Sequence, residues 1–152
     1  MYRLIMALAM AVATCFAVGC GGSSDEATSA PLTKAEFIKQ ADAICTKINK
    51  EAEVAAASWK KGFPGGIAEA EEHPDDGLRK VLVPSMEREA EQLETLEPPA
   101  KDEAMVTRFI ENLSRASETL DREGFKVLSQ SGILGFKEEV AGYGLKKCGS
   151  IL

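Results

Sequence analysis

The sequence of 152 residues has one histidine and no excess of basic residues. Its 18 Lys and Arg stand against 24 Asp and Glu, and the net charge is −6. This balance argues against a nucleic-acid partner, because such an interface needs cations to neutralise phosphates. The 13 Gly and 6 Pro are too few for a fibrous chain, and 45% apolar residues are too many for a wholly disordered one. The length fits a single domain.

Motifs that would indicate catalysis or a bound cofactor are also missing. The sequence contains no G-x-S-x-G turn, no phosphate-binding or dinucleotide-binding glycine pattern and no C-x-x-C pair. A nucleophilic triad would have to use His73. Paired carboxylates for glycoside cleavage are not visible in a sequence, because their spacing is set in space. We therefore expect a non-enzymatic protein without a cofactor.

Residues 1–19 differ in character from the rest of the chain. An apolar run of 15 residues extends from Leu4 to Val18, after one basic residue and before the small residue Gly19. This order is typical of an export signal, and the run is shorter than the roughly 20 residues needed to span a bilayer. We expect residues 1–19 to be a removed signal peptide. An uncleaved signal anchor is the alternative, because no charge closes the run.

The motif Ala17-Val18-Gly19-Cys20 resembles the lipobox of bacterial lipoproteins. The resemblance implies cleavage before Cys20 and lipidation of its thiol, so that the partner would be a membrane. Ala17 departs from the family, which most often has Leu there. Gly, Ser and other small or polar residues fill residues 20–32, which we expect to form a flexible tether. The predicted location is therefore the extracytoplasmic face of the cell membrane.

Two cysteines remain once Cys15 is assigned to the signal and Cys20 to the lipid anchor. In an exported domain, Cys45 and Cys148 are first interpreted as one disulfide. Two buried thiols are an alternative. A redox-active pair is less favoured, because the two residues are far apart in the sequence.

Apolar residues recur every three or four positions in residues 33–152, which predicts helices. Thr33 and Glu36 form a capping-box pattern, and Gly and Pro residues at 62–66 end the first helix. No segment alternates as a strand would. We predict an all-α domain, an antiparallel bundle of about four helices stapled by one disulfide. The three apolar stripes are Phe37, Ala41, Ile44, Ile48, Ala52, Ala55 and Trp59; Leu78, Leu82, Met86, Ala90 and Leu93; and Met105, Phe109, Leu113, Ala116 and Leu120.

Three positions modify this pattern. Pro84 lies inside the second stripe, where it predicts a kink or a break near Val83, because it removes a donor and crowds the preceding turn. Gly132 is expected to separate two short helical pieces in the last quarter of the chain. Gly144 is expected to end the last helix in a left-handed conformation.

Two surface features are candidates for a site. Residues 69–76 hold five carboxylates and His73, and the weak metal-ligand candidates are His73, Asp75 and Asp76. The spacing fits neither a Ca²⁺ loop nor a zinc site, so a solvated acidic loop is favoured, with residues 74–76 as the first turn of the second helix. Trp59 and Phe63 form either an aromatic patch for a partner or a small cluster that caps the bundle.

Three segments carry a wider resemblance: LTKAEFIKQADAIC at 32–45, LETLEPPA at 93–100 and YGLKKCG at 143–149. They resemble small actinobacterial-type lipoproteins of uncharacterised function. The resemblance implies a bridge between the early and late cysteines and no activity. The expected function is a non-catalytic interaction or structural module of the cell envelope, and the alternative is a carrier of an apolar or lipid-like ligand. A deep cavity lined by the stripes would favour the carrier; a filled core with an exposed apolar groove would favour the module.

Overall fold

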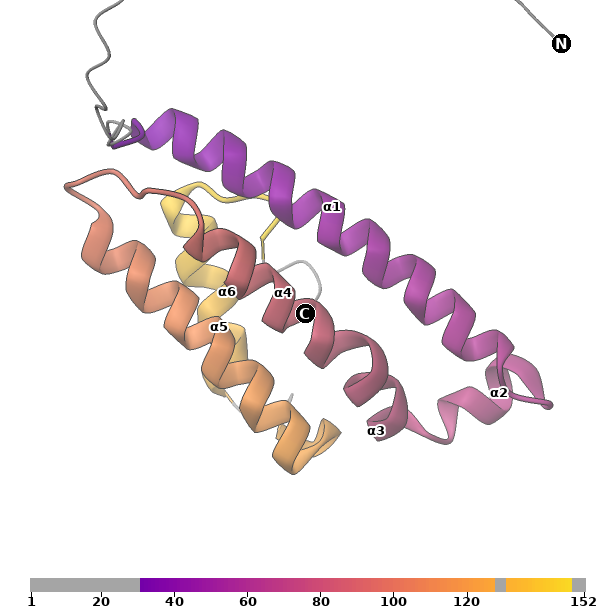
Figure 1. The fold of residues 1–152 in the computed structure, drawn as a ribbon. Helices are drawn as coiled ribbons and strands as arrows, with labels where there is room; N and C mark the ends of the chain where they lie inside the picture. The colour runs from indigo at the N-terminus through magenta and orange to yellow at the C-terminus, as the bar shows by residue number, and fades with distance from the viewer. Residues whose placement is uncertain (1–30, 128–130, 149–152) are drawn as a thin grey trace, which may run out of the picture.

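The computed structural model describes residues 31–127 and 131–148, and every regular element in these two ranges is helical (Figure 1). The long helix α1 packs on α4, α4 packs on α5, and α5 packs on α6. This arrangement confirms the all-α bundle. The elements are α1 Lys34–Lys61, α2 Gly66–Glu71, α3 Pro74–Gly77, the π-helical turn η1 Leu78–Leu82, α4 Val83–Glu94, α5 Glu103–Glu123, the 3₁₀ turn η2 Phe125–Val127, and α6 Ser131–Tyr143.

Helix α1 has the boundaries that its end signals predict. The Thr33 hydroxyl accepts the Glu36 backbone N–H, and the Glu36 carboxylate accepts the Thr33 backbone N–H at 2.9 Å. This capping box satisfies backbone donors that have no partner within the helix. The Thr33 hydroxyl and the Thr33 backbone N–H both donate to the Glu36 carboxylate, and these two hydrogen bonds lower the pKa of Glu36. The helix ends at Lys61, and Gly62 follows as the C-cap.

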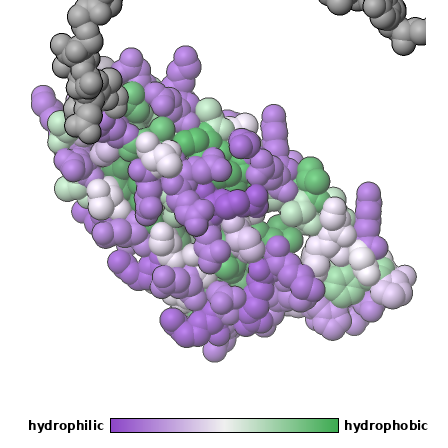
Figure 2. Space-filling view, viewed as in Figure 1, coloured by the Kyte–Doolittle hydropathy of each residue, from purple (hydrophilic) through white to green (hydrophobic). Residues whose placement is uncertain are grey.

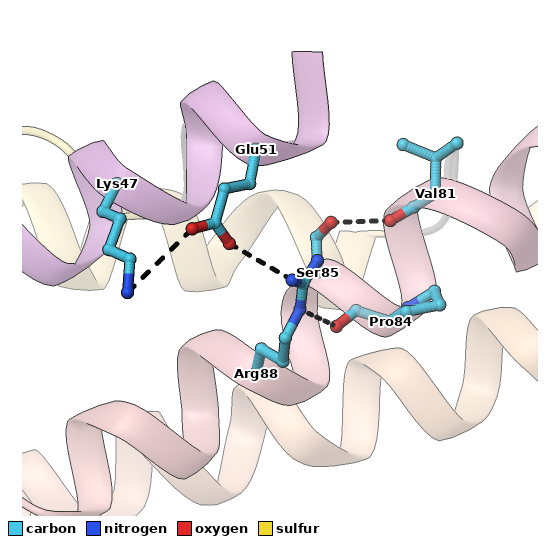
Figure 3. A network of polar contacts seen from close by, with 6 residues as sticks. All are labelled: Lys47, Glu51, Val81, Pro84, Ser85 and Arg88. Carbon is cyan, nitrogen blue, oxygen red and sulfur yellow. Dashed lines mark hydrogen bonds and ion pairs between the residues drawn. The ribbon is translucent and has the colours of Figure 1, made fainter. Parts of the chain in front are cut away.

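Pro84 is accommodated by a change of helix type. The segments α3, η1 and α4 follow one another without a gap from Pro74 to Glu94, and the Val83 N–H bonds to the Leu78 carbonyl five residues earlier. A proline clashes with the carbonyl four residues before it, and a π turn widens the backbone there. The helix is therefore modified, not broken, and the Ser85 hydroxyl donates to the Val81 carbonyl at 2.7 Å (Figure 3).

An ion-pair network joins the outer edges of α1 and α4 near this turn (Figure 3). The Arg88 guanidinium lies 3.2 Å from the Glu51 carboxylate, and Lys47 lies 3.9 Å from the same carboxylate. Arg88 also donates to the Pro84 carbonyl at 3.2 Å. All three charged side chains are partly exposed, so each pair stabilises the fold by about 0–1 kcal/mol.

The core lies between α1, α4, α5 and the C-terminal residues, and the apolar stripes face it. Tyr143 closes one end: its ring meets Phe37 edge-on at 6.2 Å and Phe109 at 5.9 Å. Its hydroxyl donates to Asp102 at 2.9 Å, just ahead of α5. Burial and the Asp102 carboxylate raise the pKa of Tyr143. The largest fully buried apolar side chains include Phe37, Phe109, Ile48, Met86, Leu93, Leu113, Leu120 and Leu145.

The last quarter of the chain differs from the prediction at Gly132. This residue lies inside α6, near its first residue, so it does not separate two helical pieces. A glycine costs a helix only about 1 kcal/mol, and near a helix end it is tolerated. The prediction for Gly144 is confirmed: its φ is +115°, and the Leu145 N–H bonds back to the Val140 carbonyl at 3.2 Å.

Residues 144–148 fasten the chain to α1. The Lys146 and Lys147 N–H groups both donate to the Asp42 carboxylate at 2.9 Å. The predicted disulfide joins Cys45 to Cys148 and closes a loop of 103 residues. Because these contacts involve α1 residues one turn apart, they fix the direction in which the segment runs along the helix.

Candidate functional site

The acidic segment does not assemble as a single site. Asp75 accepts the Phe125 backbone N–H at 2.6 Å, which ties α3 to η2. Asp76 accepts the Trp59 indole N–H at 2.9 Å and pairs with Lys80 at 3.0 Å, and these two contacts lower the pKa of Asp76. Glu69 lies within α2, which the sequence interpretation took as loop, and accepts the Gly65 N–H at 2.6 Å. The three carboxylates therefore bind three different parts of the chain.

His73 belongs to an aromatic cluster at the end of the bundle. Its ring stacks on Phe63 at 5.6 Å, and Phe63 meets Trp59 edge-on at 5.3 Å. Trp59 packs on Gly77 so closely that a Cβ there would lie 2.7 Å from the indole. These contacts agree with a cluster that caps the bundle, and Trp59 also reaches a neighbouring groove.

A buried carboxyl group that the sequence interpretation did not single out lies beside the disulfide. A Glu89 carboxyl oxygen is 3.4 Å from the Cys45 sulfur, and Glu89 is 1% exposed. With Cys148 these residues form a group whose potential ligand atoms lie within 4.8 Å of one another. Both sulfurs are in the disulfide, so neither is a thiolate that would bind a metal. The available signal for Glu89 was its position between Met86 and Ala90 on the buried face of α4.

An open groove of about 680 Å³ lies between the C-terminal half of α1 and the segment from α2 to η1. We call it the α1–η1 groove. Its walls are mainly apolar and include several small residues, and Figure 2 shows hydrophobic side chains between hydrophilic ones along this side of the molecule. The groove is lined by residues of α1, α2, α3, η1 and η2, which include Asn49, Ala52, Glu53, Ala56, Trp59, Lys60, Ala70, Glu71, Gly77, Leu78, Val81, Leu82 and Phe125.

The groove exists because two helices diverge around small side chains. Ala52 and Ala56 on α1 and Leu78 and Leu82 on η1 line it, and α2 contributes Ala70 and Glu71. The core itself is filled, since Phe37, Phe109 and Leu113 are at most 1% exposed. This combination is the one expected for an interaction surface. Single apolar stripes did not predict the groove, because its shape depends on the angle between elements.

The predicted lipidation residue, Cys20, and the signal and tether assignments for residues 1–30 lie outside the described residues. Within the described ranges, no helix combines the length and the apolar character needed to cross a membrane. No protein-family model, curated protein or solved structure matches the chain. The structure therefore defines a small helical protein with one disulfide, and the groove is its candidate site.

Proposed function

We propose that this chain is a lipoprotein tethered to the extracytoplasmic face of the cell membrane, whose helical domain is a non-catalytic interaction or structural module of the envelope. The lipobox-like motif ending at Cys20 supports the tether. The observation that carries the module is the α1–η1 groove, an open apolar surface beside a filled core. A concave, mainly apolar surface with a few polar groups is the common form of a binding site.

The tether is tested by metabolic labelling with a fatty acid. The native chain and a Cys15→Ser variant should take up label, and Cys20→Ser should not. Equal labelling of Cys20→Ser and the native chain would refute lipidation at this position.

The module is tested by site-specific photocrosslinking in the native envelope. A photoreactive residue at Ala56, which lines the groove, should give a discrete protein adduct. The matched control is Val54, which is 68% exposed and does not line the groove. No protein adduct at position 56, or the same adducts at both positions, would contradict a docking site in the groove.

The second candidate, a carrier of an apolar or lipid-like ligand, is favoured by the size of the groove. Its volume of about 680 Å³ falls within the range of about 300–1,000 Å³ that small-molecule sites occupy. The carrier predicts an apolar molecule that is extracted from the purified protein in a fixed ratio and is lost in the Ala56→Lys variant. Such a molecule would replace the interaction module as the interpretation of the groove.

A further inference from the structure

The α1 residues that line the groove lie on the same face of the helix as residues nearer its N-terminus, and residues 144–148 of the chain cover that earlier part of the face. Four α1 residues on this face, spaced by three or four positions, contact residues 144–148. Ile38 lies against Gly144, and Asp42 accepts the Lys146 and Lys147 backbone N–H groups. Cys45 forms the disulfide with Cys148, and the Asn49 side chain donates to the Lys147 carbonyl. The same spacing continues through Ala52, Glu53, Ala56 and Lys60, which line the groove. Asn49 belongs to both sets, because it contacts Lys147 and also lines the groove.

Resting on the function proposed above, we propose that the groove binds one amphipathic helix of a partner protein, with a basic residue placed between Glu53 and Glu71. The groove runs along α1 from Asn49 to Lys60, a length of about 17 Å at 1.5 Å per residue. That length corresponds to about three turns of a partner helix, whose apolar face would lie in the groove.

The small residues of the walls set how closely such a helix approaches. Ala56 on α1 and Gly77 at the end of α3 are partly exposed and project little from their backbones, while Ala52 and Ala70 are buried in the walls. Helix axes pack 8–10 Å apart, and small side chains allow the shorter distances. Val81, Leu82 and Phe125 also line the groove and are partly or fully exposed, so aliphatic residues of the partner would contact them on one side and Ala56 on the other.

The charges on the rim favour a peptide over a fatty acid or an anionic lipid. Glu53 on α1 and Glu71 at the end of α2 line the groove from different elements, and within the described residues neither carboxylate belongs to an ion pair. With Lys60 the rim carries two acidic groups and one basic group, a mixed set that suits a peptide with both a basic and an acidic residue better than a lipid with a single anionic headgroup. The groove is also open along its length, so it would leave an acyl chain partly in water.

The spacing of the rim charges makes the partner more specific. Glu53 and Lys60 are seven residues apart on α1, or about 10 Å along its axis. A partner helix lying along α1 would meet them with a basic and an acidic residue that are also about seven positions apart. The predicted partner segment therefore has an aliphatic face and such a pair of charges at its edge.

The test uses the purified full-length chain and a synthetic 18-residue helical peptide with Leu and Ala on one face and a Lys and a Glu seven residues apart. Trp59 is the only tryptophan and lines the groove, so its emission reports binding. We expect a saturable change that Glu53→Lys weakens at least tenfold. Glu118→Lys on α5 makes the same change of net charge at an exposed residue outside the groove and should weaken binding less than twofold.

A charge swap separates recognition from loss of structure. A peptide with Glu in place of its Lys should bind Glu53→Lys more tightly than it binds the native chain. Ala56→Lys should abolish binding, and Ala57→Lys, one position away on an exposed face, should preserve it. Equal effects of Glu53→Lys and Glu118→Lys, or no recovery with the swapped peptide, would refute the proposal.

Two further results distinguish this inference from the proposed function. If photocrosslinking at Ala56 captures a protein but the peptide fails to bind, the amphipathic-helix inference is wrong and the interaction module stands. If the peptide binds only after residues 149–152 are removed, the groove serves the chain's own C-terminal segment, and the partner helix is refuted. Equal binding with and without those residues supports the proposal.

Discussion

The contact between Gly77 and Trp59 offers a direct test of the packing that positions the groove. A Cβ added at Gly77 would lie 2.7, 2.8 and 3.0 Å from three atoms of the Trp59 ring. The indole cannot move aside freely, because its N–H donates to Asp76 at 2.9 Å and Phe63 packs against it at 5.3 Å. Gly142 in α6 is the matched control, since a Cβ there meets nothing within 4 Å.

The expected changes in the free energy of unfolding have opposite signs for the two alanine substitutions. Replacing a helical glycine with alanine stabilises a fold by about 0.5–1 kcal/mol, so Gly142→Ala should be more stable than the native chain. Gly77→Ala gains the same amount but overpacks against the indole, which costs about 1–3 kcal/mol, and strains the Trp59–Asp76 hydrogen bond, worth about 1 kcal/mol. We expect a net loss of about 1–3 kcal/mol for Gly77→Ala.

Urea unfolding followed by far-ultraviolet circular dichroism measures both free energies without depending on tryptophan emission. The cause is tested by a double-mutant cycle with Trp59→Ala. In that background the indole is gone, and Gly77→Ala should be neutral or stabilising. The reasoning is refuted if Gly77→Ala is as stable as Gly142→Ala in the native background, or if its penalty persists without Trp59.

Two other predictions follow from the bonds that close the bundle. The Cys45→Ala/Cys148→Ala variant should lose about 2–4 kcal/mol of unfolding free energy in urea, because the disulfide closes a loop of 103 residues; the native chain should also gain the mass of two hydrogens on reduction. A stability loss below about 1 kcal/mol would contradict that account. Because the pKa of Tyr143 is raised in the folded chain, the folded state keeps the phenol proton above pH 10, where the unfolded state loses it. The free energy of unfolding of the native chain should therefore fall as pH rises past 10, and that of Tyr143→Phe should fall less. If the unfolding free energies of the native chain and Tyr143→Phe change equally with pH above pH 7, Tyr143 does not contribute to the loss of stability.

Local signals in the sequence predicted the elements that depend on neighbouring residues. The capping box of Thr33 and Glu36, the end of α1 before Gly62 and the left-handed Gly144 were all predicted correctly. Each depends on backbone hydrogen bonds within about five residues, which a short stretch of sequence specifies. The pairing of Cys45 with Cys148 was predicted because the assignment of Cys15 to a signal and Cys20 to an anchor leaves one intramolecular choice.

Where local chemistry permits more than one outcome, tertiary packing decided between them. Pro84 permits a kink or a break, and packing of η1 and α4 on α1 selected a π turn. Gly132 permits a helix break, yet it lies in α6. Asp75 and Asp76 permit a cation site or free solvation, and they instead bind Phe125 and Trp59, residues 50 and 17 positions away.

By itself, the sequence determined that this chain folds into helices, where the first helix begins and ends, and which faces turn inward, because periodicity and capping are local properties. Only the tertiary structure decided that Glu89 is buried beside the disulfide and that Ala52, Ala56 and Leu78 line an open groove. Both features arise where faces from distant segments meet. The arrangement of α1 and η1 that leaves the groove open results from their packing, and the sequence of either element alone does not specify it.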